Sequence, residues 1–82
     1  MSYEEAIKAG KVKVGTKQTM KAVELGSAAR VFVARDADTR ITSKVIQLCQ
    51  HRGIPVTYVD SMKQLGKTCG IEVGAAMAAL LK

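Results

Sequence analysis

Residues 30–34 form a short run, Arg-Val-Phe-Val-Ala, that is apolar at every position after the arginine. A strand with one face in water alternates apolar and polar residues, whereas a strand that is covered on both faces is apolar throughout. The run therefore predicts a buried strand, and such a strand requires a layer of structure on each side of its sheet.

Further strand-like and helix-like segments alternate around this run. We expect a strand at 11–14, where lysine and valine alternate and only one face is buried, and another at 54–59, where Pro55 stands at the start. Residues 75–81 are ambiguous. Their alanines favour a helix by propensity, but such a short helix at a chain end is marginal, and small residues in a strand pack tightly between helices.

Glycine ends each of the predicted helices. The helices are residues 2–10, 17–25, 40–52 and 61–70, and the glycines are Gly10, Gly26, Gly53 and Gly70. Capping boxes open the first and the last of them, Ser2 with Glu5 and Ser61 with Gln64. The helical apolar positions that we expect to be buried are Met20, Val23, Ile41, Val45, Leu48 and Cys49.

This alternation of elements predicts an α/β fold, a three-layer α/β/α sandwich. The chain has 82 residues, which leaves no room for a second core, so we expect residues 1–82 to form one domain.

Charge and composition indicate the class of partner. Lysine and arginine number 13 against 7 acids, a formal net charge of +6, which favours a polyanion or an acidic partner; a lysine excess for solubility is the alternative. The polar start predicts no signal peptide, and the longest apolar run, 74–81, is too short to cross a bilayer. We expect Cys49 and Cys69 to be buried thiols and the protein to be cytoplasmic.

The segment 15–21, Gly-Thr-Lys-Gln-Thr-Met-Lys, is typical of an anion-binding helix start. Gly15 allows close approach of another backbone, Thr16 is the expected cap, and the first-turn N–H groups favour an anion. Lys17 and Lys21 share one helical face, where their like charges repel. An ordinary solvated lysine face would have the same pattern.

Signatures of catalysis or metal binding are weak. His51 is the only histidine and lies near a predicted helix end, where a surface position suits it. One histidine and two distant cysteines do not make a zinc site. Asp36 and Asp38 are expected to cap and shape the loop before a helix. We therefore predict no enzyme activity, no metal and no cofactor. The aromatic residues are too few for a platform that stacks nucleic-acid bases.

Three segments, 15–21, Asp36-Ala37-Asp38 and 65–76, together resemble the kink-turn-binding ribosomal protein family of the L-seven-Ae and L-thirty-e type. The bacterial YbxF-like branch is the most similar, and the resemblance spans essentially the whole chain. It implies an α/β/α sandwich around a small mixed four-stranded sheet, with a strand rather than a helix at 75–81. It also implies binding to RNA kink-turns, which are sharply bent duplexes with sheared G·A pairs and bulged nucleotides.

The resemblance also assigns site residues. It implies that the helix beginning at Gly15 enters the major groove at the G·A pairs, which a bend must first open. It implies an apolar contact between the 70–74 loop and bulged nucleotides, and an acid near an extruded base; burial of the loop and helix capping by the acid are the alternatives. The implied RNA-binding residues are Gly15, Thr16, Lys17, Gln18, Lys21, Asp38, Gly70, Ile71, Glu72 and Val73.

Archaeal-type members of the family carry Asn-Glu where this chain has Lys17 and Gln18, so base contacts are expected to differ in detail. The expected partner is a kink-turn in ribosomal RNA or a riboswitch, bound by a monomer and away from any membrane. Two other functions stay open: a protein-interaction scaffold of the same fold, and a binder of small phosphates at the Gly15 helix start.

Overall fold

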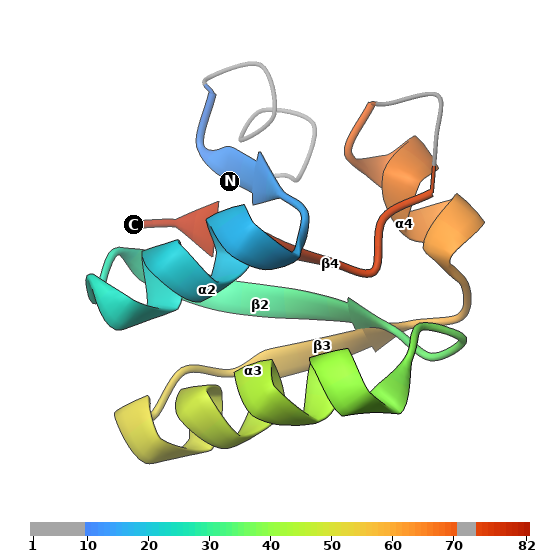
Figure 1. Cartoon of the computed structure of the whole chain (residues 1–82). Helices are drawn as coiled ribbons and strands as arrows, with labels where there is room; N and C mark the ends of the chain where they lie inside the picture. The colour runs from blue at the N-terminus through green and yellow to red at the C-terminus, as the bar shows by residue number, and fades with distance from the viewer. Residues whose placement is uncertain (1–9, 71–73) are drawn as a thin grey trace.

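The computed structural model describes residues 10–70 and 74–82, and its elements alternate along the chain as predicted (Figure 1). The predicted helix at 2–10 lies outside the described residues, apart from Gly10. Residues Met77–Leu81 form a strand, which confirms the strand prediction for the C-terminal segment. The described elements are β1 (Val12–Val14), α2 (Thr16–Glu24), β2 (Ala28–Ala34), α3 (Thr39–Arg52), β3 (Val56–Val59), α4 (Met62–Thr68) and β4 (Met77–Leu81).

The strands form one mixed sheet in the order β1-β4-β2-β3. The last strand, β4, lies between β1 and β2 and is antiparallel to both, whereas β2 and β3 are parallel. In the central strands, Ala78 and Ala79 of β4 are fully buried, because both faces of the sheet are covered there. This placement explains why a segment with high helix propensity forms a strand: tertiary pairing on two sides outweighs local preference.

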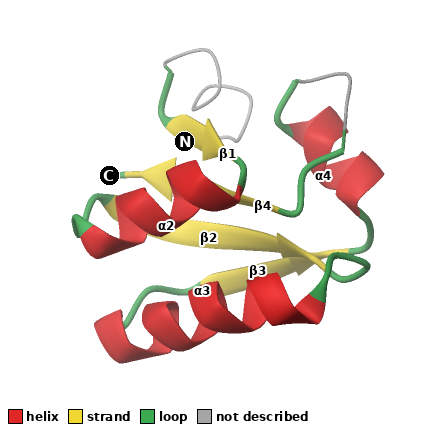
Figure 2. Ribbon diagram, in the orientation of Figure 1, coloured by secondary structure: helices red, strands yellow, loops and turns green. Residues whose placement is uncertain are grey.

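Alternating residues of β2 face two separate cores, as the apolar run predicts. Val31 and Val33 pack in a cluster with residues of α2 and α3, whereas Phe32 and Ala34 pack in a second cluster with Leu65 of α4. Figure 2 shows α2 and α3 next to each other, and these two helices are in contact. The predicted three layers are therefore α2 with α3, the sheet, and α4.

The buried stripe of α3 differs from the predicted one. Ile41 is 40% exposed, so its assignment to the core is wrong, while Thr42, Val45 and Cys49 are buried. Val45 and Cys49 fix the direction of the buried face, and Thr42 lies three residues before Val45 on that face. Ile41 lies on the flank of this face in the first turn of α3, where it packs against neither core cluster.

The two cysteines are buried and free, as predicted. Cys49 belongs to the cluster formed with α2 and α3, whereas Cys69 belongs to the cluster on the α4 face. The sheet separates the two thiols, so they cannot form a disulfide with each other in this fold. Burial raises the pKa of both the Cys49 and the Cys69 thiol, which keeps them protonated and poorly reactive.

Thr19 of α2 generates a stability prediction. Its side chain is fully buried, and its hydroxyl oxygen has no hydrogen-bond partner among the described residues. Thr19→Val keeps the shape and removes the unsatisfied hydroxyl, so we expect the free energy of unfolding to rise by about 1–3 kcal/mol in urea titration. Thr19→Ser keeps the hydroxyl and removes a buried methyl, and should lower it by about 1 kcal/mol. A loss of stability in the valine variant would contradict this account.

Candidate functional site

Gly15 forms the turn from β1 into α2. Its backbone, with φ 104° and ψ 161°, lies in a region that residues with a Cβ atom avoid. Its N–H donates to the carbonyl of Met77 at 2.9 Å, and its own carbonyl accepts from the N–H of Thr19 at 2.9 Å. The turn therefore joins the start of α2 directly to the start of β4.

No side chain of the described residues caps the start of α2, and its first turn contains no acid. Thr16 was expected to be the cap, and this prediction is wrong. A cap must have non-helical backbone angles, and here Gly15 takes that position, so Thr16 is the first residue of the helix itself. Within the described residues, no side chain therefore competes with an external acceptor for the first-turn N–H groups.

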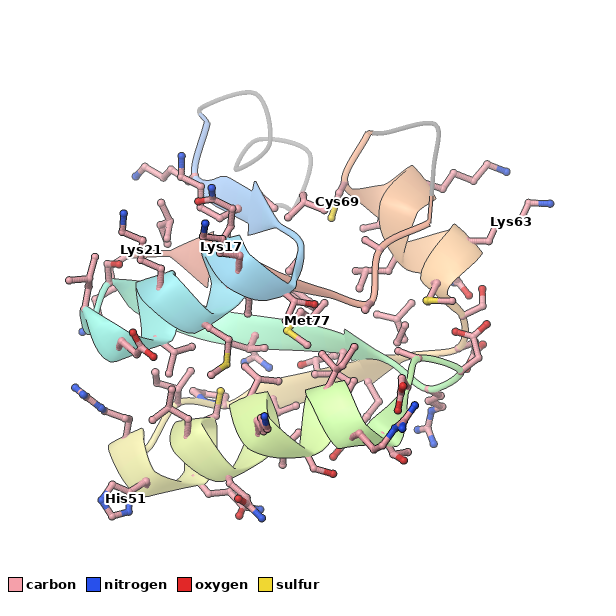
Figure 3. The ribbon with its side chains drawn as sticks, in the orientation of Figure 1. Lys17, Lys21, His51, Lys63, Cys69 and Met77 are labelled. Atoms are coloured by element: carbon pink, nitrogen blue, oxygen red, sulfur yellow. The ribbon has the colours of Figure 1, made fainter. Side chains whose placement is uncertain are left out.

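Lys17, Gln18 and Lys21 are exposed on α2. Figure 3 shows that Lys17 and Lys21 extend on the side of α2 away from α3. Neither lysine has a carboxylate within 4 Å among the residues that the structure describes, where the ion pair found joins Arg40 and Asp38. This face of α2 therefore carries positive charge that the described part of the chain does not neutralise.

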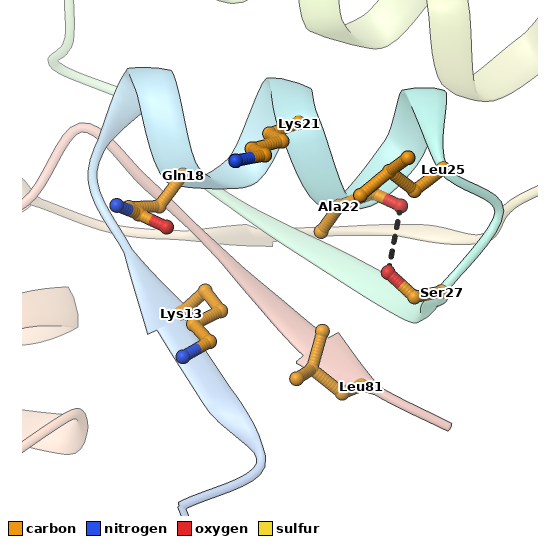
Figure 4. Close-up of a pocket in the computed structure, with 7 residues that line it drawn as sticks. All are labelled: Lys13, Gln18, Lys21, Ala22, Leu25, Ser27 and Leu81. Atoms are coloured by element: carbon orange, nitrogen blue, oxygen red, sulfur yellow. Dashed lines mark hydrogen bonds between the residues drawn. The ribbon is translucent and has the colours of Figure 1, made fainter.

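A hollow of about 260 Å³ lies between β1 and this face of α2 (Figure 4). It contains a lysine that the sequence predictions missed, Lys13 of β1. The alternation of lysine and valine in 11–14 was the signal that could have found it, because a strand with Val12 and Val14 on one face must present Lys13 on the other. The lining residues are Lys13, Gln18, Lys21, Ala22, Leu25, Ser27 and Leu81.

The loop at 70–74, which the resemblance assigns to the RNA interface, is described only at its two ends. Gly70 is exposed just after α4, with a positive φ of 77°, whereas Ile71, Glu72 and Val73 lie outside the described residues. Gly74 lies close to Met62, since a Cβ on this glycine would come within 3.2 Å of the Met62 Cβ.

The chain after Gly74 runs to the start of α2. The N–H of Ala75 donates to the carbonyl of Met62 at 3.0 Å, and the carbonyl of Ala76 accepts from Ala34 at 2.9 Å. The next carbonyl, that of Met77, accepts from Gly15. The chain just after the 70–74 loop and the start of α2 at Gly15 therefore lie at the same end of the sheet.

Asp36 and Asp38 have structural roles, as predicted for this loop. An oxygen of Asp36 accepts from the N–H of Met62 at 2.7 Å, which ties the loop to the start of α4. Asp38 caps α3 through the N–H of Arg40 at 2.9 Å and forms an ion pair with the Arg40 guanidinium at 3.0 Å. The Arg40 side-chain hydrogen bond, followed by the backbone bond, lowers the pKa of the Asp38 carboxyl. Contact of Asp38 with an extruded base stays a prediction.

The described residues supply neither a metal-binding cluster nor a membrane-spanning helix. Within residues 10–70 and 74–82, no group of three or more His, Cys, Asp or Glu side chains is arranged to hold a metal ion. His51 is exposed in the last turn of α3. The helices of the described segments are all too short or too polar to span a bilayer.

Comparison with known proteins shows a family match. The profile of the Ribosomal protein L7Ae/L30e/S12e/Gadd45 family matches residues 2–82. A Geobacillus kaustophilus protein named RNA-binding protein GK0100 is 54% identical over 82 residues, and RNA-binding protein YbxF of Geobacillus stearothermophilus is 52% identical over 82 residues. Each match covers 100% of both chains.

A solved structure shows the same fold. The Giardia lamblia 15.5kD RNA binding protein superimposes with a TM-score of 0.90 at 27% identity, over 98% of this chain and 68% of that one. The family resemblance drawn from the three segments is therefore confirmed.

Gly15 generates a prediction about the turn that positions the site. Gly15→Ala meets no atom within 4 Å, so its cost is backbone strain, and we expect the free energy of unfolding to fall by about 1–3 kcal/mol in urea titration. Thr16→Ala, one residue later in the ordinary helical turn, is the matched control and should change it by less than about 0.5 kcal/mol. Equal effects of the two substitutions would show that the Gly15 conformation is not the source of the cost.

Proposed function

Because this chain belongs to the Ribosomal protein L7Ae/L30e/S12e/Gadd45 family, we propose that it is a non-enzymatic RNA-binding protein. Relatives that match over their full length carry RNA binding in their names. The net charge of +6 and the α2 lysines, which have no carboxylate within 4 Å among the described residues, are consistent with a polyanionic partner.

The RNA feature that we propose is the kink-turn. The observation that carries this proposal is the start of α2, where no described side chain caps the first-turn N–H groups beside Lys17 and Gln18. Lysine can donate to guanine O6 and N7 or to a phosphate, and glutamine can both donate and accept. Such a helix end can read base edges only where the RNA major groove is opened, as it is at a sharp bend.

Recognition of a bent duplex would also stabilise the bend. A protein that binds only the bent form shifts the RNA toward that form by no more than its preference for it. We propose that Lys17, Gln18 and Lys21 supply this preference at the G·A pairs, through contacts with base edges and with the adjoining phosphates. Ile71 and Val73 would contact the bulged nucleotides, which stays a prediction from the family resemblance. The proposed target is a kink-turn in ribosomal RNA or in a riboswitch, bound by a monomer in the cytoplasm.

Titration against paired RNAs tests the proposed specificity. We expect a kink-turn RNA to bind at least about tenfold more tightly than the same RNA with its G·A pairs replaced by Watson–Crick pairs, a difference of about 1.4 kcal/mol. Calorimetry at one fixed salt concentration measures both affinities. Equal affinity for the two RNAs would refute recognition of the bend, and no binding to either would favour the protein scaffold.

Single lysine variants test how α2 contacts the RNA. Lys17→Ala and Lys21→Ala should each weaken kink-turn binding by about 1–3 kcal/mol if the lysine reads a base edge. A lysine that contacts only a phosphate should instead lower the slope of log K against log salt by about one. Lys44→Ala removes an exposed lysine of α3 that lines a different hollow, with Met20 and Glu24, and should leave both quantities unchanged. Wild-type affinity in the Lys17, Lys21 double variant would place the interface elsewhere.

A further inference from the structure

The hollow between β1 and α2 extends the positively charged surface beyond the start of α2. We propose that Lys13 and Lys21 hold the phosphate backbone of an RNA stem in this hollow, so that the RNA interface extends from the start of α2 to Lys13 of β1. This inference rests on the proposed RNA-binding function and adds Lys13, a residue on a different element, to the interface.

Strand pairing determines the direction of Lys13. Val12 and Val14 pack against the cluster on the α4 face, so the residue between them projects from the opposite face of the sheet. The register agrees, because Lys13 pairs with Ala79, which belongs to the cluster formed with α2 and α3. Lys13 therefore stands on the same side of the sheet as α2, and Figure 4 shows it on β1 facing the hollow.

The charges around the hollow favour an anion. Lys13 and Lys21 both line it, both are exposed, and neither has a carboxylate within 4 Å in the described part of the chain. The described lining contains two ammonium groups and no acid, so the two lysines repel each other until an anion lies between them. A lysine ammonium is a compact point charge that suits a phosphate group.

The rest of the lining fits a sugar–phosphate chain better than a small ion alone. Ala22, Leu25 and Leu81 supply apolar surface, and Leu25 is 71% exposed. Gln18 adds an amide that can donate or accept near the start of α2. Apolar surface between cationic residues matches a ribose between phosphates. The hollow begins beside Gln18 and leads along α2 toward Leu25 and Leu81, with Lys13 of β1 on its other wall.

Salt dependence with Lys13→Ala tests the inference. Each lost phosphate contact lowers the slope of log K against log salt by about 0.7–0.9, so between about 50 and 200 mM salt the affinity of the variant should fall about threefold less than that of the wild type. Its preference for the kink-turn over the G·A-replaced control should be unchanged, since a backbone contact carries no sequence information. Lys13→Arg should restore the slope, and Lys44→Ala is the matched control with wild-type behaviour.

Shortening the two RNA stems in turn locates the contact. One of the two truncations should remove the difference between wild type and Lys13→Ala, because the proposed contact lies on a stem. A wild-type slope in the alanine variant, or a difference that survives both truncations, would overturn the inference. Failure of the proposed kink-turn function is a separate outcome: the wild type would then not distinguish the two RNAs, while the Lys13 slope on either RNA could still be read.

Discussion

The pairing of β4 with both β1 and β2 is the interaction on which the rest of the structure depends. It brings the C-terminal strand into the middle of the sheet and gives the sheet two covered faces. It also fixes the site, because the carbonyl of Met77, the first residue of β4, accepts from the N–H of Gly15. Without this strand, β1 would lose its neighbour in the sheet and α2 its anchor.

The composition of β4 suits this position. Ala78 and Ala79 are fully buried on opposite faces of the strand, and their small side chains leave room for the larger residues of the adjacent β2 and of the covering helices. The same smallness makes the segment a good helix former in isolation. The fold therefore depends on a segment whose local preference is overridden by its neighbours.

The surface proposed to bind RNA combines a rigid backbone with unsatisfied charge. Lys17 and Lys21 repel each other along α2, and Lys13 adds a third cation across the hollow, without a described acid in ion-pair distance. The α2 start also has no side-chain cap from the described residues, whereas α3 and α4 are capped by Asp38 and Ser61. Departures from local stability rules that cluster at one place are typical of a binding surface.

Much of this protein follows from the sequence by itself. Continuous apolarity at 31–34 determined a strand covered on both faces, and capping residues and glycines determined most helix ends, because these depend on local chemistry. Only the tertiary structure decided that Ile41 is exposed, that Gly15 rather than Thr16 is the non-helical residue before α2, and that Lys13 shares a hollow with Lys21. These three features depend on which face of each helix or strand packs against its neighbour. The packing is determined by the pairing of strands that are distant along the chain.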